Sequence, residues 1–264
     1  MTRKTILINL LISAFFFVNS PSSSAQPEYL SLNNAKTIEA GRLETGIFQP
    51  LRYGLSDQLE VAVHPLLFAL IPNVSVKRLW WQTDKLFFAS QHIVTFPSPL
   101  LKTLARKGSG GILPEESIVK PIVALNTKLL FTWLYNEKNM VTFEAGVKLA
   151  ASNKNLDLPT IDLPLVFPRT AAYYERYALS FAVVTEGSLY KQWEYIANAR
   201  AFVLPYDVGK WALEQSTKVR WVKPSGKMAI EGGYILTYGD YPFGKQLNIL
   251  PVVDLRFAFG QSGQ

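Results

Sequence analysis

Apolar and polar residues alternate along most of the chain beyond residue 40. Between Leu247 and Phe259 every odd-numbered position is apolar, whereas Asp254 and Arg256 occupy even-numbered positions. Successive side chains of a β-strand point to opposite faces of its sheet, so a period of two predicts strands rather than helices. The same alternation recurs in the runs 123–133, 141–149, 193–203, 211–221 and 228–238. We therefore expect an all-β fold.

The connections between these runs are of two kinds. Short polar turns are predicted at 56–57, 136–139, 186–188 and 224–226, and longer connections at 97–117 and 153–170. From residue 97 onward, long and short connections alternate along the chain. A barrel with tight turns at one end and loops at the other has connections in this order.

The predicted strands are long and have aromatic residues near their ends. The run 247–259 covers 13 residues, whereas strands of soluble proteins average about 5–6 and a strand that crosses a bilayer needs about 9–11. Trp133, Trp193 and Trp221 lie near run ends, and aromatic rings are enriched at membrane interfaces. The combination predicts a single antiparallel transmembrane β-barrel. A secreted lipocalin-like binding protein, which would also alternate, stays open as a further alternative.

The N-terminus has the three parts of a signal peptide. Arg3 and Lys4 precede an apolar run at 6–18, and Ala25 follows a polar stretch with a small residue two positions earlier. We expect cleavage after Ala25. The predicted organisation is a signal peptide at 1–25, an N-terminal segment at 26–40 and an outer-membrane β-barrel at 41–264.

Composition excludes several classes of function. The chain is 48% hydrophobic, 13% aromatic and 18% charged, with no Cys and 2 His. Disordered proteins have the opposite balance, and thiol catalysis, disulfide scaffolds and cysteine-based metal sites need cysteine. We predict neither cofactor nor metal. The formal net charge of +7 is spread too evenly along the chain to indicate nucleic-acid binding.

Both ends of the mature chain resemble bacterial outer-membrane barrels. The segments 41–46 and 51–60, with Tyr53-Gly54-Leu55-Ser56-Asp57 at the turn, resemble the opening hairpin of many small barrels of Gram-negative bacteria. The last strand ends on Leu255, Phe257 and Phe259, and it resembles the signal read by the barrel-assembly machinery. The resemblance implies that machinery as a partner during biogenesis, and outer-membrane lipid and lipopolysaccharide as surroundings.

The strand count is twelve by expectation, with ten as the alternative. We count eleven runs: 42–54, 58–64, 73–82, 85–96, 119–134, 139–151, 171–186, 189–204, 210–223, 227–239 and 246–259. Bacterial single-chain barrels have an even number of strands. Either residues 30–40 add a strand, or one of the two runs around Pro65 and Pro72 is miscounted.

The face opposite the lipid carries the candidate lumen residues. Six are acidic and six are basic: Glu44, Glu60, Glu144, Glu214, Glu231, Asp254, Lys128, Lys148, Arg200, Lys218, Arg220 and Arg256. Unpaired charges in a narrow lumen are costly, so we expect salt bridges between neighbouring strands. This interior predicts a non-enzymatic barrel that is structural or weakly pore-forming. A specific channel or transporter for a small solute is the alternative.

A lipid esterase or deacylase is a second alternative. Ser90 and His92 share one face of a strand, about 7 Å apart along it, and a nucleophile must approach its base to about 2.6–3.2 Å. His64, before Pro65, is expected at a strand end. Lys102, Arg106 and Lys107 precede the glycine-rich stretch 108–111, and this basic loop could contact lipopolysaccharide phosphates.

Overall fold

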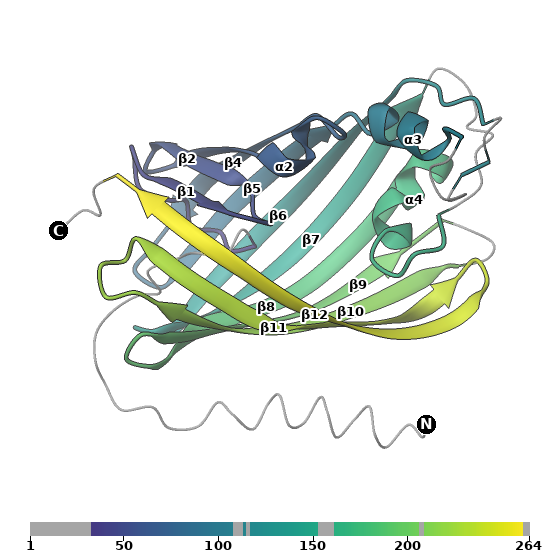
Figure 1. Cartoon of the computed structure of the whole chain (residues 1–264). Coiled ribbons are helices and arrows are strands. Elements are labelled where there is room, and N and C mark those ends of the chain that lie inside the picture. Colours follow the sequence, from purple (N-terminus) through teal and green to yellow (C-terminus); the bar gives the residue numbers. More distant parts are fainter. Residues whose placement is uncertain (1–32, 108–112, 115–116, 153–160, 206–208, 261–264) are drawn as a thin grey trace.

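The computed structural model describes residues 33–107, 113–114, 117–152, 161–205 and 209–260 (Figure 1). The predicted signal peptide, the first part of the N-terminal segment and the glycines at 108–111 lie outside the described residues. Among the described residues, no helix is long and apolar enough to cross a membrane.

Twelve strands close into one antiparallel barrel, as the alternation predicts. The strands are β1 Leu43–Gly46, β2 Leu51–Ser56, β3 Leu59–Val63, β4 Asn73–Gln82, β5 Leu86–Thr95, β6 Ile122–Asn136, β7 Asn139–Ser152, β8 Tyr177–Tyr190, β9 Trp193–Val203, β10 Trp211–Val222, β11 Met228–Tyr241 and β12 Gly244–Phe259. Each strand pairs with its neighbours in the sequence, and β12 pairs with β1. The all-β class and the barrel are thereby confirmed.

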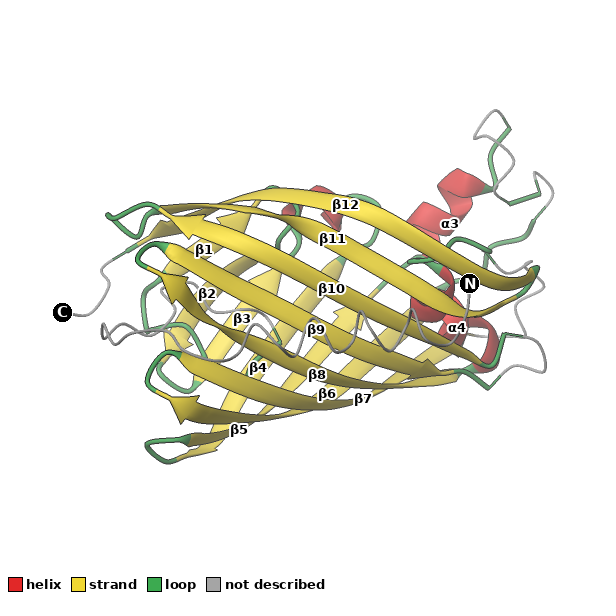
Figure 2. Cartoon of the chain, turned by 90° about the horizontal axis from the view of Figure 1, so that it is seen from below, coloured by secondary structure: helices red, strands yellow, loops and turns green. Residues whose placement is uncertain are grey.

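In the described part of the chain, three short helices lie in the connections. They are α2 Pro65–Phe68, α3 Ser98–Leu104 and α4 Phe167–Glu175. Figure 2 shows α3 and α4 together at one end of the barrel, opposite the tight turns. Leu101 of α3, Tyr173 of α4 and Ile122 of β6 share one buried apolar cluster. We call this end the loop end and the other the turn end.

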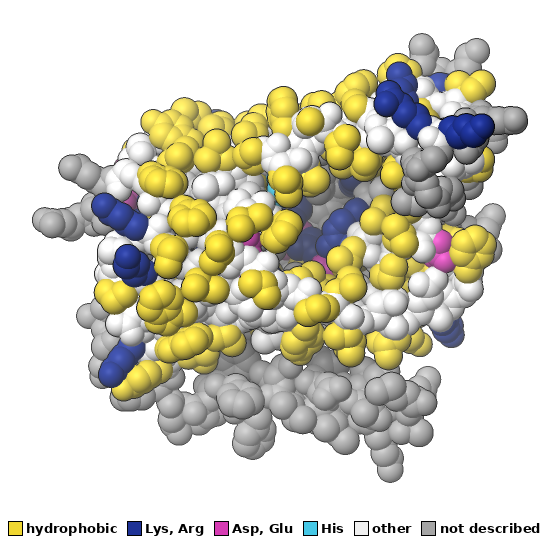
Figure 3. Space-filling model, in the orientation of Figure 1, with side chains coloured by type: hydrophobic (Ala, Val, Ile, Leu, Met, Phe, Trp, Pro, Cys, Tyr) yellow, Lys and Arg dark blue, Asp and Glu magenta, His cyan; other side chains and the backbone are white. Residues whose placement is uncertain are grey.

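The two faces of the wall carry opposite chemistry. Phe131, Phe143 and Phe181 project outward and are exposed, whereas Glu144 on the other face of β7 is buried. Figure 3 shows the outer surface covered largely by hydrophobic side chains. A membrane barrel requires an apolar exterior, because lipid offers no partner for polar groups.

The strand number is confirmed, but both explanations given for the twelfth strand are wrong. The predicted run 42–54 divides into β1 and β2, which are separated by residues 47–50. Pro50 ends that break and has no N–H for a ladder. The described part of the N-terminal segment, 33–40, forms no strand. Alternation alone did not reveal the break, because apolar residues continue through it.

Three other boundaries differ from the sequence prediction. Residues 171–175 belong to α4, so β8 begins only at Tyr177, and the predicted turn at 186–188 is part of β8. The chain turns instead at Lys191, whose φ of 48° is left-handed. The connection 97–117 contains α3, where we expected a loop.

Strand length varies around the barrel. β1, β2 and β3 have 4, 6 and 5 residues, whereas β6, β7 and β12 have 15, 14 and 16. The closing seam between β1 and β12 is therefore only four residue pairs long, from Leu43–Phe259 to Gly46–Arg256. On this side β12 therefore has a strand partner only near the turn end, and none farther toward the loop end.

Candidate functional site in the barrel interior

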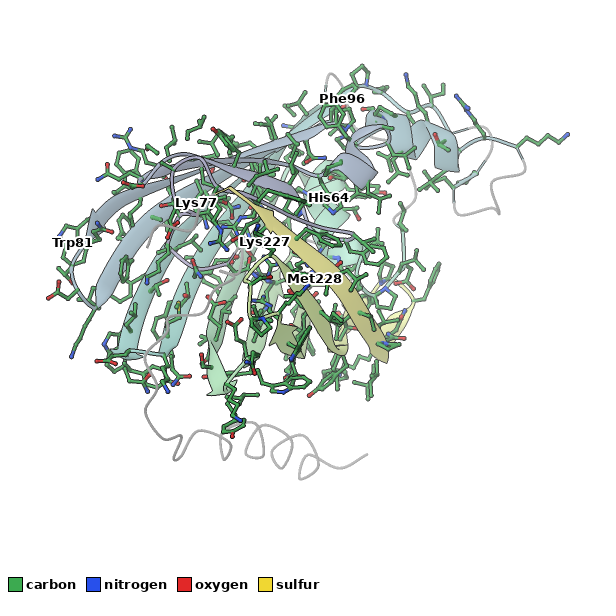
Figure 4. The ribbon with its side chains drawn as sticks, turned by 60° about the vertical axis from the view of Figure 1, so that its left-hand side comes forward. His64, Lys77, Trp81, Phe96, Lys227 and Met228 are labelled. Carbon is green, nitrogen blue, oxygen red and sulfur yellow. The ribbon has the colours of Figure 1, made fainter. Side chains whose placement is uncertain are left out.

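The turn end of the interior contains a buried ion-pair network. Arg52 bridges two carboxylates, with Nη1 3.3 Å from Glu44 Oε2 and Nη2 2.7 Å from Glu60 Oε2. Lys77 Nζ lies 3.5 Å from Glu60 Oε2, and Arg42 Nε lies 2.9 Å from Glu44 Oε1. Figure 4 shows Lys77 among the side chains of the interior, and Trp81 at the rim of the turn end.

A second group of charges continues this network around the lumen. Arg220 Nη1 is 3.0 Å from Glu194 Oε2 and its Nη2 is 3.0 Å from Glu231 Oε1. Arg256 Nη1 is also 3.0 Å from Glu231 Oε1, and its Nη2 reaches Glu44 Oε2 at 3.6 Å. Arg256 therefore joins the two groups into one network. We call it the turn-end network.

The strand register explains these pairs. Arg220 lies directly opposite Glu231 on β11 and Glu194 on β9, and Arg52 lies opposite Glu44 on β1. Directly opposed residues on one face of an antiparallel pair have Cβ atoms about 4.5–5.5 Å apart. Opposite charges placed there pair without distortion of the strands.

The N-terminal segment occupies the lumen at the same level. Asn34 Nδ2 donates to Glu186 Oε1 at 2.6 Å, and the backbone N–H of Ala35 donates to Thr132 Oγ1 at 2.8 Å. Lys77 Nζ donates to the carbonyl oxygen of Lys36 at 2.9 Å. Burial lowers the pKa of Lys36, and the Glu186 carboxylate partly offsets this effect. Residues 33–40 thus form a plug that is bonded to several strands.

The plug also lies tightly against β2. A Cβ added at Gly54 would come within 2.0 Å of the Glu39 carbonyl oxygen. Only glycine leaves room for this approach. The sequence around Gly54 therefore has a packing role in addition to its place in the hairpin.

The loop-end half of the interior is hollow. A cavity of about 330 Å³ is lined by Asn33, Asn126, Lys128, Lys148, Pro168, Arg169, Ala178, Leu179, Ser180, Asn198, Arg200, Phe202 and Glu214. Four of these side chains are basic and one is acidic. We call it the cationic cavity.

The basic residues of the cavity are held in place by the wall and by α4. Glu144 pairs with Arg200 and with Lys128, whose Nζ lies 3.3 Å from Oε1. Arg169 Nη2 lies 2.7 Å from Glu214 Oε2. Lys148 Nζ donates to the Arg169 carbonyl oxygen at 2.6 Å and to the Tyr173 hydroxyl at 3.1 Å. Lys148 therefore neutralises no carboxylate through these contacts.

Helix α4 positions Arg169 and Tyr173 because its apolar face is buried. Phe167, Ala171 and Ala172 pack with Phe202 and Tyr241 in one cluster. Pro168 stands in the first turn, where a missing N–H costs nothing. The helix ends at Arg176, which has a left-handed φ of 70°. The polar face of α4, which carries Arg169, therefore lies toward the cavity.

The twelve predicted lumen residues fall into three groups. Glu44, Glu60, Lys218, Arg220, Glu231 and Arg256 lie in the turn-end network. Lys128, Glu144, Lys148, Arg200 and Glu214 lie at the cationic cavity. Asp254 is buried beside the break after β1, where its Oδ1 accepts the Phe48 N–H at 3.1 Å.

Sequence reasoning missed several interior residues. Arg42, Arg52, Lys77, Glu186 and Glu194 are all buried charges of the turn-end half. The alternation within β2, β4, β8 and β9 places the last four on the inner faces and could have found them. Arg169 lies on a helix inside a connection, and no strand pattern predicts its position.

Ser90 and His92 project from the outer face of β5. His92 Nε2 lies 3.1 Å from Ser90 Oγ, and His92 Nδ1 lies 3.2 Å from Thr127 Oγ1. Trp80 Nε1 donates to Ser90 Oγ at 2.8 Å, and Ser90 is only 4% exposed. The second ring nitrogen thus faces a hydroxyl and not a carboxylate, and the indole shields the serine. This arrangement satisfies polar groups on a lipid-facing wall.

An apolar exterior around a charged interior is the reverse of a soluble barrel. The fold is that of a transmembrane β-barrel. A lipocalin-like protein would instead expose its polar face to water, which these exposed aromatic side chains contradict.

Comparison with solved structures finds outer-membrane proteins at low identity. The chain is similar to a bacterial polysaccharide outer membrane secretin, at 13% identity and a TM-score of 0.43 over 82% of this chain and 70% of that one. It is similar to the outer membrane channel DcaP of Acinetobacter baumannii, at 10% identity and a TM-score of 0.41 over 90% of this chain and 68% of that one. A Pseudomonas aeruginosa FadL homologue has 10% identity and a TM-score of 0.41 over 82% and 66%.

No protein-family model matches the chain. No curated protein is significantly similar to it in sequence. At these identities and TM-scores the chain is assigned neither a family nor a transported solute.

Proposed function

We propose that the protein is a non-enzymatic outer-membrane channel that takes small anionic solutes into its cationic cavity. The observation that carries the proposal is the lining: four basic side chains face one carboxylate. Counting also Glu144, which pairs with Lys128 and Arg200 of the lining, four positive and two negative groups leave a formal charge of +2. A charged cleft with low-dielectric walls concentrates counter-ions.

The cavity differs in this respect from an ion-pair network that only closes a barrel. In the turn-end network, Arg220 and Arg52 each contact two carboxylates. At the cavity, Lys148 contacts a carbonyl oxygen and a hydroxyl, so its positive charge is available to a solute. A purely structural barrel gains nothing from such a lysine, because the uncompensated charge is unfavourable.

Ion selectivity in planar bilayers tests the proposal. In a salt gradient across a bilayer that contains the wild-type protein, the reversal potential should have the sign that indicates preference for anions over cations. Lys148→Gln should move that potential toward zero, because it removes a cavity charge while the amide keeps a polar side chain. Lys245→Gln is the matched control, since Lys245 is exposed at the start of β12.

Two results would contradict the proposal. Cation selectivity in the wild type would mean that the cavity does not govern passage. Absence of conductance, both in the wild type and after removal of the plug, would return the protein to a structural role.

A further inference from the structure

One edge of β12 has no strand partner over most of its length. Among the described residues, β11 pairs with β12 from Met228–Phe257 to Tyr241–Gly244, whereas β1 reaches only from Phe259 to Arg256. The backbone N–H of Ile47 adds one bond to the Leu255 carbonyl oxygen at 3.1 Å. Residues 244–253 therefore present a free edge. Pro251 lies within it, and proline is tolerated in edge strands.

The opposite rim of this gap is made of short and apolar segments. It consists of residues 47–50, the end of β3 at Val63, His64 and helix α2. His64 Nε2 lies 3.2 Å from the Phe48 carbonyl oxygen, and Figure 4 shows His64 beside α2. None of the residues of α2 is buried. We call the gap between this rim and residues 244–253 of β12 the lateral window.

The window is apolar around its edge and polar behind it. Phe48 is 61% exposed and Val253 is 67% exposed; Ile47, Leu66, Phe68 and Ile249 are exposed as well. Figure 3 shows a hollow in this side of the wall, with hydrophobic side chains around it and Lys, Arg, Asp or Glu side chains inside. Leu250 belongs to the inner face of β12, yet it is 37% exposed, because no neighbouring strand covers it.

The cationic cavity lies across the lumen from the window. Its lining comes from β6 to β10 and from α4. In the closed order of strands, β7 is the farthest from the seam of β12, β1 and β2, and β6 and β8 flank it. A molecule that enters through the window therefore meets the basic side chains of the opposite wall.

The interior also contains polar atoms that lack a partner. Asn198 Oδ1, which belongs to the cavity lining, and Asn248 Nδ2 on β12 are buried with no hydrogen-bond partner among the described residues. Buried polar atoms in native proteins are bonded to protein, water or ligand. Both amides are therefore available to a polar head group.

We infer that the ligand is an anionic amphiphile, a carboxylate or phosphate head on one hydrocarbon chain, which exchanges with the membrane through the lateral window. This inference rests on the proposed function and specifies its substrate class. The cavity of about 330 Å³ holds roughly eleven water volumes of about 30 Å³ each, enough for a head group and the first part of a chain. The rest of the chain lies in the apolar window, where its burial is worth about 0.8 kcal/mol per CH₂.

Binding by two chain lengths tests the inference. The full mature protein in lipid nanodiscs is titrated with dodecanoate, dodecyl phosphate, butyrate and dodecanol in a calorimeter. The wild type should bind a twelve-carbon anion at least tenfold more tightly than butyrate or dodecanol. The better of the two twelve-carbon anions identifies the head group.

Two variants separate the window from the cavity. Leu250→Trp narrows the window from the inner face, and Ile249→Trp is its control, because that side chain points outward. Leu250→Trp should lower the affinity for the twelve-carbon anion at least tenfold and leave the affinity for butyrate unchanged. Lys148→Gln should lower the affinity for both anions. Retention of the heat-dependent gel shift shows that each variant is folded.

The outcomes are distinguishable. Unchanged binding of the long-chain anion in Leu250→Trp, or equal affinity for butyrate and dodecanoate, would overturn the lateral route while leaving an anion channel in place. Tight binding of dodecanol would show that the head group is not recognised. Failure of every anion to bind would remove the proposed function together with the inference.

Discussion

The two halves of the barrel interior contain the same types of charged residue but arrange them differently. At the turn end, arginines and glutamates of adjacent strands pair with one another and surround the plug. At the loop end, four basic residues surround a cavity with one acidic residue in its lining. The first half is sealed and the second is hollow. The number of charged residues alone therefore does not distinguish a structural ion-pair network from a candidate binding site. The ratio of basic to acidic residues does.

The largest effect is expected from the loss of Arg220. Arg220→Leu leaves the buried carboxylates of Glu194 and Glu231 without their central partner. Removal of one member of a buried pair costs about 3–5 kcal/mol. Urea unfolding in detergent, followed by the heat-dependent gel shift, measures the change. A midpoint equal to that of the wild type would show that the turn-end network does not hold the barrel closed.

Deletion of the plug should change conductance more than stability. Removal of residues 26–40 from the mature chain abolishes the bonds to Glu186, Thr132 and Lys77 and empties the turn end of the lumen. We expect a severalfold rise in single-channel conductance in planar bilayers. Equal conductance would mean that the plug does not limit passage and that solutes leave by another route.

A cavity carboxylate should matter less for stability than a network arginine. Glu214→Gln removes an ion pair in which the Arg169 side chain is 45% exposed, and exposed pairs contribute about 0–1 kcal/mol. It also removes the acidic group of the cavity lining, so anion selectivity should rise. Reversal potentials and urea midpoints are measured on the same preparation. A decrease in the urea midpoint as large as that of Arg220→Leu would contradict the distinction between the two halves.

The smallest effect on conductance is expected from a change on the outer wall. His92→Ala breaks the contacts with Ser90 and Thr127, and each such bond is worth about 0.5–1.5 kcal/mol. Conductance should be unchanged. Hydrolysis of a short-chain nitrophenyl ester by the wild type that disappears in this variant would instead support the esterase alternative and contradict a non-enzymatic role.

The barrel was predictable because its signals are local. The alternation in β6, β7 and β9 to β12 is set by lipid on one side and charges on the other, and it continues without a break. The division between β1 and β2 was not predictable in this way. Ile47 and Phe48 continue the apolar composition, and the bend is held by contacts distant in the sequence, such as that of the Phe48 N–H with Asp254, 206 positions away.

The candidate site was predictable only in part for the same reason. Glu144, Lys148 and Arg200 follow the strand pattern, so their inward direction could be derived from it. Their division between a network and a cavity depends on what lies between the strands: the plug at one end, and α4 with Arg169 at the other. Those segments have no alternation, and their positions depend on contacts that are distant in the sequence.

The four-pair seam between β1 and β12 has a consequence for how the barrel opens and closes. The other neighbour of β1 is held by fewer pairs still, with two paired positions against β2, whereas β12 has fourteen against β11. Cooperative rupture begins where the fewest hydrogen bonds must break together. Local opening of the barrel wall is therefore expected first at residues 43–46.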